Sequence, residues 1–135
     1  MKTKQVIVMR AKYPDGQGGT RTLRKGKLVA QGSHASMAFL SKRVRESFGT
    51  GQPPKFTEEE LAWLEGSFAK VCLYVDTEEQ LLQIFHKARE QGLTAELITD
   101  SGLTEFHGIP TNTCIAIGPH EASKIDPITG DLKLL

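Results

Sequence analysis

The first apolar segment of the chain constrains its fold more than any other feature. Residues 4–10 read Lys-Gln-Val-Ile-Val-Met-Arg, with β-branched residues through the middle. A strand with one solvated face would alternate apolar and polar residues, and this run does not, which predicts a strand buried on both faces. Strands of this kind belong to sheets that are covered by helices on both sides. The sequence is therefore expected to fold as an α/β protein.

Helices for both faces follow along the chain. A long helix is expected over about 26–48, because a breaker segment rich in Gly and Pro occupies 49–54. Two capping boxes, each a Thr followed three residues later by Glu or Gln, predict helices over about 57–65 and 77–91. The element order favours one domain, residues 1–135, in three layers of type α/β/α.

Three more strands are expected, over 68–75, 96–99 and 113–117, from their apolar and β-branched residues. The pair Gly118-Pro119 is expected to end the last of them, and the tail after residue 121 to form a turn and an extended end. We expect the two cysteines, Cys72 and Cys114, to be buried reduced thiols, which suits a cytoplasmic protein. No stretch reaches the length of a membrane span.

Charge is distributed unevenly along the chain. Residues 1–49 carry eleven Lys/Arg and two Asp/Glu, a net charge of +9, whereas residues 50–135 carry a net charge of −8. This division favours an anionic partner for one face, although an ordinary pattern of surface salt bridges could also produce it. Within the basic half, residues 11–24 hold strong turn signals and are expected to form a mobile loop. The basic residues of this loop and of the helix start are candidates for contacting RNA phosphates: Lys12, Arg21, Arg24 and Lys25.

The start of the long helix carries a polar row. At about 100° per residue, Lys27, Gln31 and His34 fall within one narrow sector, beside apolar sectors that can be buried. A lysine at a helix N-terminus opposes the helix dipole, and it makes better sense if something negative binds there. A solvated helix edge is the alternative, and spacing alone does not choose between the two.

A second polar group follows a short strand. Asp100 lies at its carboxyl end, where open α/β sheets place their ligands, with Thr104 and Thr113 further along. A carboxylate can orient or deprotonate a water, and hydroxyls can hold that water. The alternative, slightly favoured by these residues alone, is an Asx-turn in which Asp100 bonds only local backbone. The four histidines lack zinc spacing, and no phosphate-binding or nucleophile motif is present, so no metal or cofactor is expected.

These residues form an ordered set of motifs that resembles the type II peptidyl-tRNA hydrolase family, which is usual in archaea and eukaryotes. The motifs span nearly the whole chain: Gly26-Lys27, Gln31, His34-Ala35, Lys70, Asp100-x-Gly102-x-Thr104, Thr113-Cys114-Ile115-Ala116-Ile117-Gly118-Pro119 and Leu132-Lys133-Leu134. The resemblance implies a mixed four-stranded sheet with helices on both faces and, often, a homodimer. It also implies hydrolysis of the ester between a peptidyl group and the terminal ribose of tRNA, without a cofactor.

The resemblance further implies which residues act. Asp100, Lys27, Gln31, His34, Thr104 and Thr113 correspond to the catalytic group, and Lys70 is assigned to tRNA binding with the basic residues of the loop. Two alternatives remain: a module of the same fold that grips RNA without hydrolysis, and an interaction domain whose basic face meets an acidic protein.

The chain departs from the family pattern at three places. The loop after the first strand is longer and richer in glycine than the usual short loop with an Asp-Leu pair. Glu105 stands where an amide is usual, and the segment between Thr104 and Thr113 is one residue longer. These differences bear on substrate preference and on the position of Thr113 more than on the fold.

Overall fold

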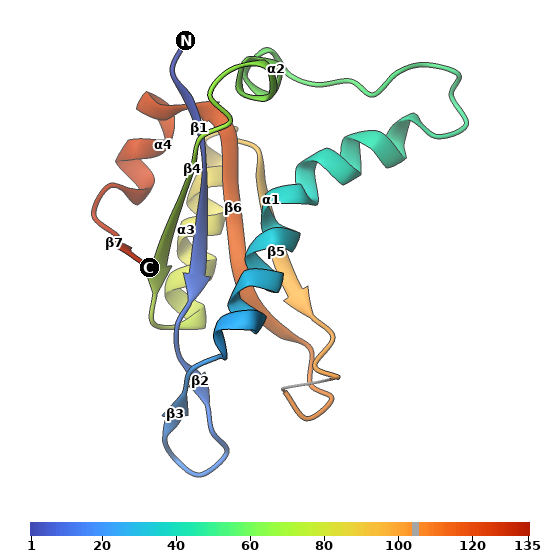
Figure 1. Ribbon diagram of the computed structural model, residues 1–135. Coiled ribbons are helices and arrows are strands. Elements are labelled where there is room, and N and C mark those ends of the chain that lie inside the picture. The colour runs from blue at the N-terminus through green and yellow to red at the C-terminus, as the bar shows by residue number, and fades with distance from the viewer. Residues whose placement is uncertain (104–105) are drawn as a thin grey trace.

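One mixed sheet runs through the protein, with helices on both of its faces, in a computed structural model that describes residues 1–103 and 106–135 (Figure 1). The elements that form the sheet and its helices are β1 Thr3–Arg10, α1 Lys25–Ser47, α2 Glu58–Glu65, β4 Lys70–Val75, α3 Glu78–Glu90, β5 Ala95–Asp100, β6 Thr111–Glu121, α4 Ala122–Thr129 and β7 Lys133–Leu134. The α/β class with helix layers on both faces is thus confirmed.

The sheet has five strands among the described residues, in the order β5-β6-β1-β4-β7, rather than the four that were expected. Strand β1 is parallel to β4 and antiparallel to β6, and β6 is antiparallel to β5. The additional strand, β7, pairs antiparallel with β4 through only two residues. A two-residue strand at the edge carries too few side chains to leave a periodic signal in the sequence.

Strand β1 is buried on both faces, as its composition predicts. Val6 and Val8 pack in the core cluster that includes residues of α3 and α4, and neither side chain is exposed to solvent. Ile7 and Met9 point the other way and pack with Ala35 of α1. Because successive strand residues face opposite sides, one apolar run supplies both cores.

The predicted helices are confirmed to within one or two residues. Both capping boxes are present, with Thr57 accepting from the Glu60 backbone N–H and Thr77 from that of Gln80. Helix α1 ends at Ser47, directly before the breaker segment.

The expectation for the C-terminal part of the chain is wrong for residues 118–129, whereas the expected extended end is present as β7. Strand β6 continues through Gly118-Pro119 to Glu121, with a register irregularity opposite β1 between Lys4 and Val6. The following segment is helix α4 and contains Pro127, which marks a turn when only local sequence is considered. Ile125 and Ile128 are three residues apart and lie in the core, and their burial outweighs the cost of the proline.

The glycine-rich segment after β1 contains a small hairpin that was not expected. Its strands are β2 Tyr13–Pro14 and β3 Thr20–Arg21, paired antiparallel. The Asp15 carboxylate closes the turn, since its Oδ1 accepts from the backbone N–H groups of Gln17 at 2.7 Å and Gly19 at 3.0 Å. Figure 1 shows this hairpin at the end of the molecule where α1 begins.

None of the helices in residues 1–103 and 106–135 combines the length and the apolar character that crossing a membrane requires.

Candidate active site

Helix α1 begins without the features that usually stabilise a helix start. Its N-cap residue, Arg24, makes no capping hydrogen bond through its side chain, and no acidic residue lies in the first turn. Negative charge is supplied instead from another element, because Lys27 Nζ lies 3.0 Å from Asp100 Oδ1 at the end of β5. Both side chains are only 12% exposed. The lysine at the helix start therefore has an anionic counterpart within the protein.

The polar row of α1 continues the contact. Gln31 lies one turn after Lys27, and its Nε2 donates to the same Asp100 oxygen at 3.1 Å. On the other side of the amide, Thr113 Oγ1 donates to Gln31 Oε1 at 2.5 Å. Gln31 is 2% exposed and Thr113 is fully buried. The carboxylate can only accept, so the hydroxyl donor on Oε1 keeps the NH₂ group of Gln31 directed at Asp100.

Asp100 also forms the local contact of an Asx-turn. Its Oδ2 accepts from the backbone N–H of Gly102 at 2.8 Å, so the local turn is present, but Asp100 does not bond only local backbone, because its Oδ1 also contacts Lys27 and Gln31. Gly102 has φ +84°, and a Cβ there would collide with the backbone of Ile109.

The ionisation of Asp100 follows from these contacts. Partial burial acts to raise the pKa of Asp100, but the hydrogen bonds from Lys27, Gly102 and Gln31 outweigh it and hold that pKa below its ordinary value. At neutral pH the site therefore presents an ionised carboxylate beside an ammonium group.

Beside the network lies a buried cysteine, Cys114. Cys114 donates its thiol hydrogen to the Gln31 carbonyl oxygen, with Sγ at 3.3 Å, and burial raises the pKa of Cys114 to about 12. A thiol of this kind is not a nucleophile. Cys114 is buried as expected, whereas Cys72 is exposed, contrary to the expectation. In the described part of the chain, no group of three or more His, Cys, Asp or Glu side chains could hold a metal ion.

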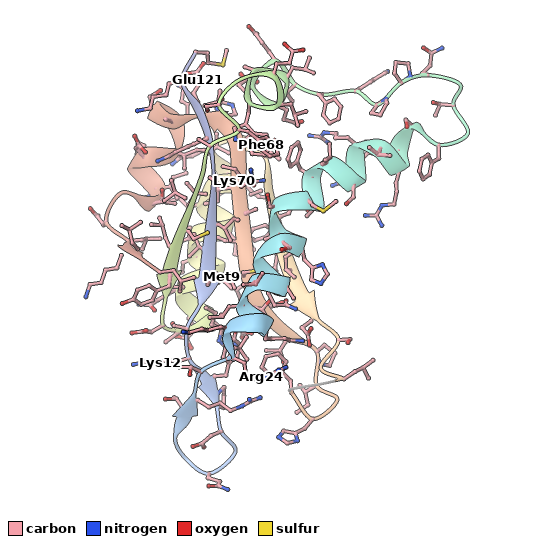
Figure 2. All side chains as sticks on the ribbon, in the orientation of Figure 1. Met9, Lys12, Arg24, Phe68, Lys70 and Glu121 are labelled. Carbon is pink, nitrogen blue, oxygen red and sulfur yellow. The ribbon has the colours of Figure 1, made fainter. Side chains whose placement is uncertain are left out.

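Basic residues of the hairpin segment and the helix start lie near the same end of the molecule. Figure 2 shows Lys12 and Arg24 there, where α1 begins. Lys12 Nζ lies 3.8 Å from Asp76, and the Arg21 guanidinium lies 5.4 Å from the centre of the Phe106 ring. Lys25 is the first residue of α1. The expected basic loop and the Lys27–Asp100 pair are therefore neighbours.

Comparison with known proteins identifies the family. The family described as Peptidyl-tRNA hydrolase PTH2 matches residues 3–135. The chain belongs to this family. A peptidyl-tRNA hydrolase of Methanopyrus kandleri is 43% identical over 133 residues, covering 98% of this chain and 97% of the relative. Those of Methanocaldococcus jannaschii and Sulfurisphaera tokodaii are 42% and 35% identical, over 82% and 100% of this chain and 88% and 100% of the relatives.

In this member of the peptidyl-tRNA hydrolase family, the structure brings Lys27, Gln31, Asp100 and Thr113 into one hydrogen-bonded network. It does not bring His34 and Lys70 into that network. His34 is exposed one turn beyond Gln31.

Lys70 lies opposite Gln5 in the β1–β4 register, near the other end of the sheet from the Asp100 site (Figure 2). Its ammonium lies 3.3 Å from the centre of the Phe68 ring and donates to the Phe68 carbonyl at 3.0 Å. Thr104 lies outside the described residues.

Two residues near the network escaped the sequence reasoning. The Tyr13 hydroxyl donates to the Thr113 carbonyl at 3.4 Å, and burial raises the pKa of Tyr13, which keeps the phenol protonated. The Arg10 guanidinium lies 4.4 Å from the Tyr13 ring centre and donates to the carbonyls of Lys12 and Asn112. The only signal in the sequence was an arginine and a tyrosine near the end of a buried strand. Two such residues form no periodic pattern that could mark them as neighbours of a site.

Proposed function

We propose that this chain hydrolyses the ester between a peptidyl group and tRNA, releasing free tRNA, with the Lys27–Asp100 cluster as its active site. Family membership supports the hydrolysis reaction, and one structural observation supports the assignment of this cluster as the active site. Four side chains from α1, β5 and β6 converge in a single network at the end of the molecule where α1 begins.

Asp100 acts on the water in this proposal. Asp100 is ionised at neutral pH, so it can accept a hydrogen bond from the water, orient it toward the ester carbonyl and take up its proton. The water oxygen bonds to the carbonyl carbon, the ester C–O bond breaks, and a proton passes to the departing ribose oxygen. Peptide acid and free tRNA are the products.

Lys27 stabilises the negative charge that develops on the carbonyl oxygen. It lies in the first turn of α1, where unpaired backbone N–H groups add positive potential. Gln31 and Thr113 are buried, so they act by holding Asp100 rather than by touching substrate. His34 and Thr104 keep their proposed place in the catalytic group, and His34 is exposed to solvent.

Phosphates of the tRNA are proposed to contact the basic residues around the start of α1. Such contacts position a nucleic acid without reading its sequence. The proposed set combines the hairpin segment and the helix start with the more distant Lys70: Lys12, Arg21, Arg24, Lys25 and Lys70. A tRNA-processing hydrolase of this kind is expected in the cytoplasm.

We further propose a homodimer, the assembly that the family resemblance implies. An apolar groove of about 540 Å³ lies between α1 and β4, and exposed Val29, Met37 and Phe68 line it. A second copy that covers this surface would remove those side chains from water. Met37→Glu should lower the mass measured by light scattering across a dilution series, and an unchanged mass would refute this surface.

The test of function is hydrolysis of a peptidyl-tRNA, followed by separation of charged from free tRNA. Asp100→Asn should lower the rate roughly 100- to 10,000-fold, the usual cost of losing a positioned acid–base group. The matched control is Asp126→Asn, because Asp126 also pairs with a lysine, Lys4 at 2.6 Å, but is 57% exposed and belongs to α4.

The outcomes separate the alternatives. Binding of tRNA without hydrolysis by the wild type would leave a non-catalytic RNA-binding module. Equal rates for Asp100→Asn and the control would mean that the cluster is not the catalytic site.

A further inference from the structure

A small cavity lies between the β2–β3 hairpin and the segment that precedes β6. Its volume is about 240 Å³, and its walls include Tyr13, Pro14, Arg21, Phe106, Ile109 and Thr111. The two ring centres of Tyr13 and Phe106 are 5.1 Å apart, so the hairpin packs directly on the segment opposite. One wall of this hairpin cavity is therefore built by the glycine-rich insertion that departs from the family pattern.

The hairpin cavity adjoins the proposed active site through two of its wall residues. Thr111 is the cross-strand neighbour of Asp100 in the β5–β6 register. Tyr13 donates to the carbonyl of Thr113, whose hydroxyl holds Gln31. By contrast, the apolar groove beside β4 lies across α1 from the side where Gln31 meets Asp100.

A peptidyl-tRNA bound with its ester at Asp100 places a nucleobase near the hairpin cavity. The ester is attached to a ribose, and the same ribose carries a nucleobase, so a base lies within one sugar of the carbonyl beside Asp100. The cavity volume of about 240 Å³ is the volume that roughly eight molecules occupy in liquid water. That space suits one planar base and is smaller than the usual pocket for a larger ligand.

The walls offer the contacts that an unpaired base uses. The Arg21 guanidinium is held 5.4 Å from the centre of the Phe106 ring and presents a planar cation, the group on which bases stack. Ile109, which is 64% exposed, and Pro14 add apolar surface at the rim.

We propose that the hairpin cavity binds the nucleobase of the tRNA nucleotide whose ribose carries the ester. The inference rests on the proposed hydrolase function and adds the subsite for the leaving group. It assigns the insertion after β1 a role in positioning the terminal nucleotide, besides the phosphate contacts proposed for its basic residues.

Binding is tested first, without hydrolysis. Adenosine monophosphate and ribose phosphate are titrated into the protein by calorimetry. The wild type should bind the nucleotide roughly 5- to 150-fold more tightly, the range that corresponds to one base-stacking contact. Ile109→Trp, which fills the cavity, should abolish the difference, whereas Leu134→Trp, at an exposed position on β7, should keep it.

Hydrolysis provides the second measurement. An N-acetylaminoacyl ester of adenosine is compared with the same ester of a ribose that lacks a base. The wild type should favour the adenosine ester in kcat/KM, and Ile109→Trp should bring the ratio close to one. Arg21→Lys keeps the charge but removes the planar guanidinium, so it should also reduce the ratio.

Each outcome decides a separate point. Equal affinity of the wild type for both phosphates, or equal kcat/KM on both esters, would overturn the subsite while leaving the hydrolase assignment intact. A loss in Ile109→Trp that is the same on both esters would also overturn it, because the cavity would then serve the reaction without distinguishing a base. Preferential nucleotide binding in a protein that hydrolyses no ester would refute the proposed function and keep the subsite.

Discussion

Thr113→Val is the most informative change in the network, because valine keeps the shape of threonine and removes only the hydroxyl. In the wild type, the Thr113 hydroxyl donates to Gln31 Oε1 at 2.5 Å, and the Gln31 NH₂ group donates to Asp100 at 3.1 Å. Valine leaves that buried amide oxygen without its donor. If the amide turns over to find another, an oxygen faces the Asp100 carboxylate, and a hydrogen bond becomes a repulsion.

The size of the effect follows from burial. Gln31 is 2% exposed, so an amide oxygen left unsatisfied there should cost about 1–3 kcal/mol of folding free energy. For a chain of 135 residues this corresponds to a fall in Tm of roughly 4 to 12 °C. The displaced carboxylate should lower kcat about 10- to 100-fold, because small misplacements of a catalytic group are costly. KM should change little, since Thr113 is buried.

The assay combines thermal unfolding with steady-state hydrolysis of one peptidyl-tRNA. Thr113→Ser retains the hydroxyl and should recover most of the rate. A Thr113→Val enzyme with wild-type kcat and Tm would show that Gln31 is oriented by something else. A loss shared equally by the serine and valine variants would point to packing of the threonine methyl group.

Three other predictions follow from the same structure. Lys27→Ala should lower kcat with KM little changed if the lysine stabilises the transition state. If Lys27 instead meets a phosphate, the substitution should flatten the salt dependence of tRNA binding by about one unit of slope. Steady-state kinetics should show neither effect for the control variant, Lys133→Ala. Serine at all four basic positions near the start of α1 should raise KM for tRNA substrates, more at low salt, while sparing a peptidyl ester of a ribose that carries neither a base nor a phosphate. Equal losses on both would contradict a phosphate role for Lys12, Arg21, Arg24 and Lys25. The pKa of Asp100 is lower in the folded protein than in the unfolded chain, so the stability that Asp100 contributes is fully present above the unfolded carboxyl pKa and is lost as pH falls through the folded pKa. The difference in urea midpoint between wild type and Asp100→Asn should therefore shrink on acidification. A constant difference from neutral to acid pH would contradict the assigned pKa direction.

The sequence was sufficient for the two-sided burial of β1 and for the helical side of the site. One unbroken apolar run revealed the first, and the spacing of Lys27 and Gln31 placed both side chains on one edge of α1. Asp100 was located by the rule that ligands gather at strand ends, but its partners come from distant elements, so composition could not choose between a local turn and a site. Motif resemblance favoured the site, and the structure adds the contacts of Asp100 with Lys27 and Gln31.

Features that depend on tertiary contact were beyond the reach of the sequence. Pro127 indicates a turn locally, and α4 forms because Ile125 and Ile128 reach the core. The register of β1 with β4 decides that Lys70 lies away from Asp100, and no pattern within β4 reveals a register. Tyr13 becomes important only because the hairpin turns it back toward Thr113.

The network joins residues that are 69, 73 and 82 positions apart; two of its contacts link α1 with β5, and the third links α1 with β6. No fragment of the chain that lacks one of these elements can hold Asp100 in place. During synthesis, Asp100 and Thr113 emerge long after α1, so the proposed active site is complete only when β6, the last inner strand, joins the sheet. Loop closures of this length are slow to form compared with helix contacts. Recovery of hydrolysis after dilution from denaturant therefore reports completion of the sheet, at a point when helical circular dichroism has already returned.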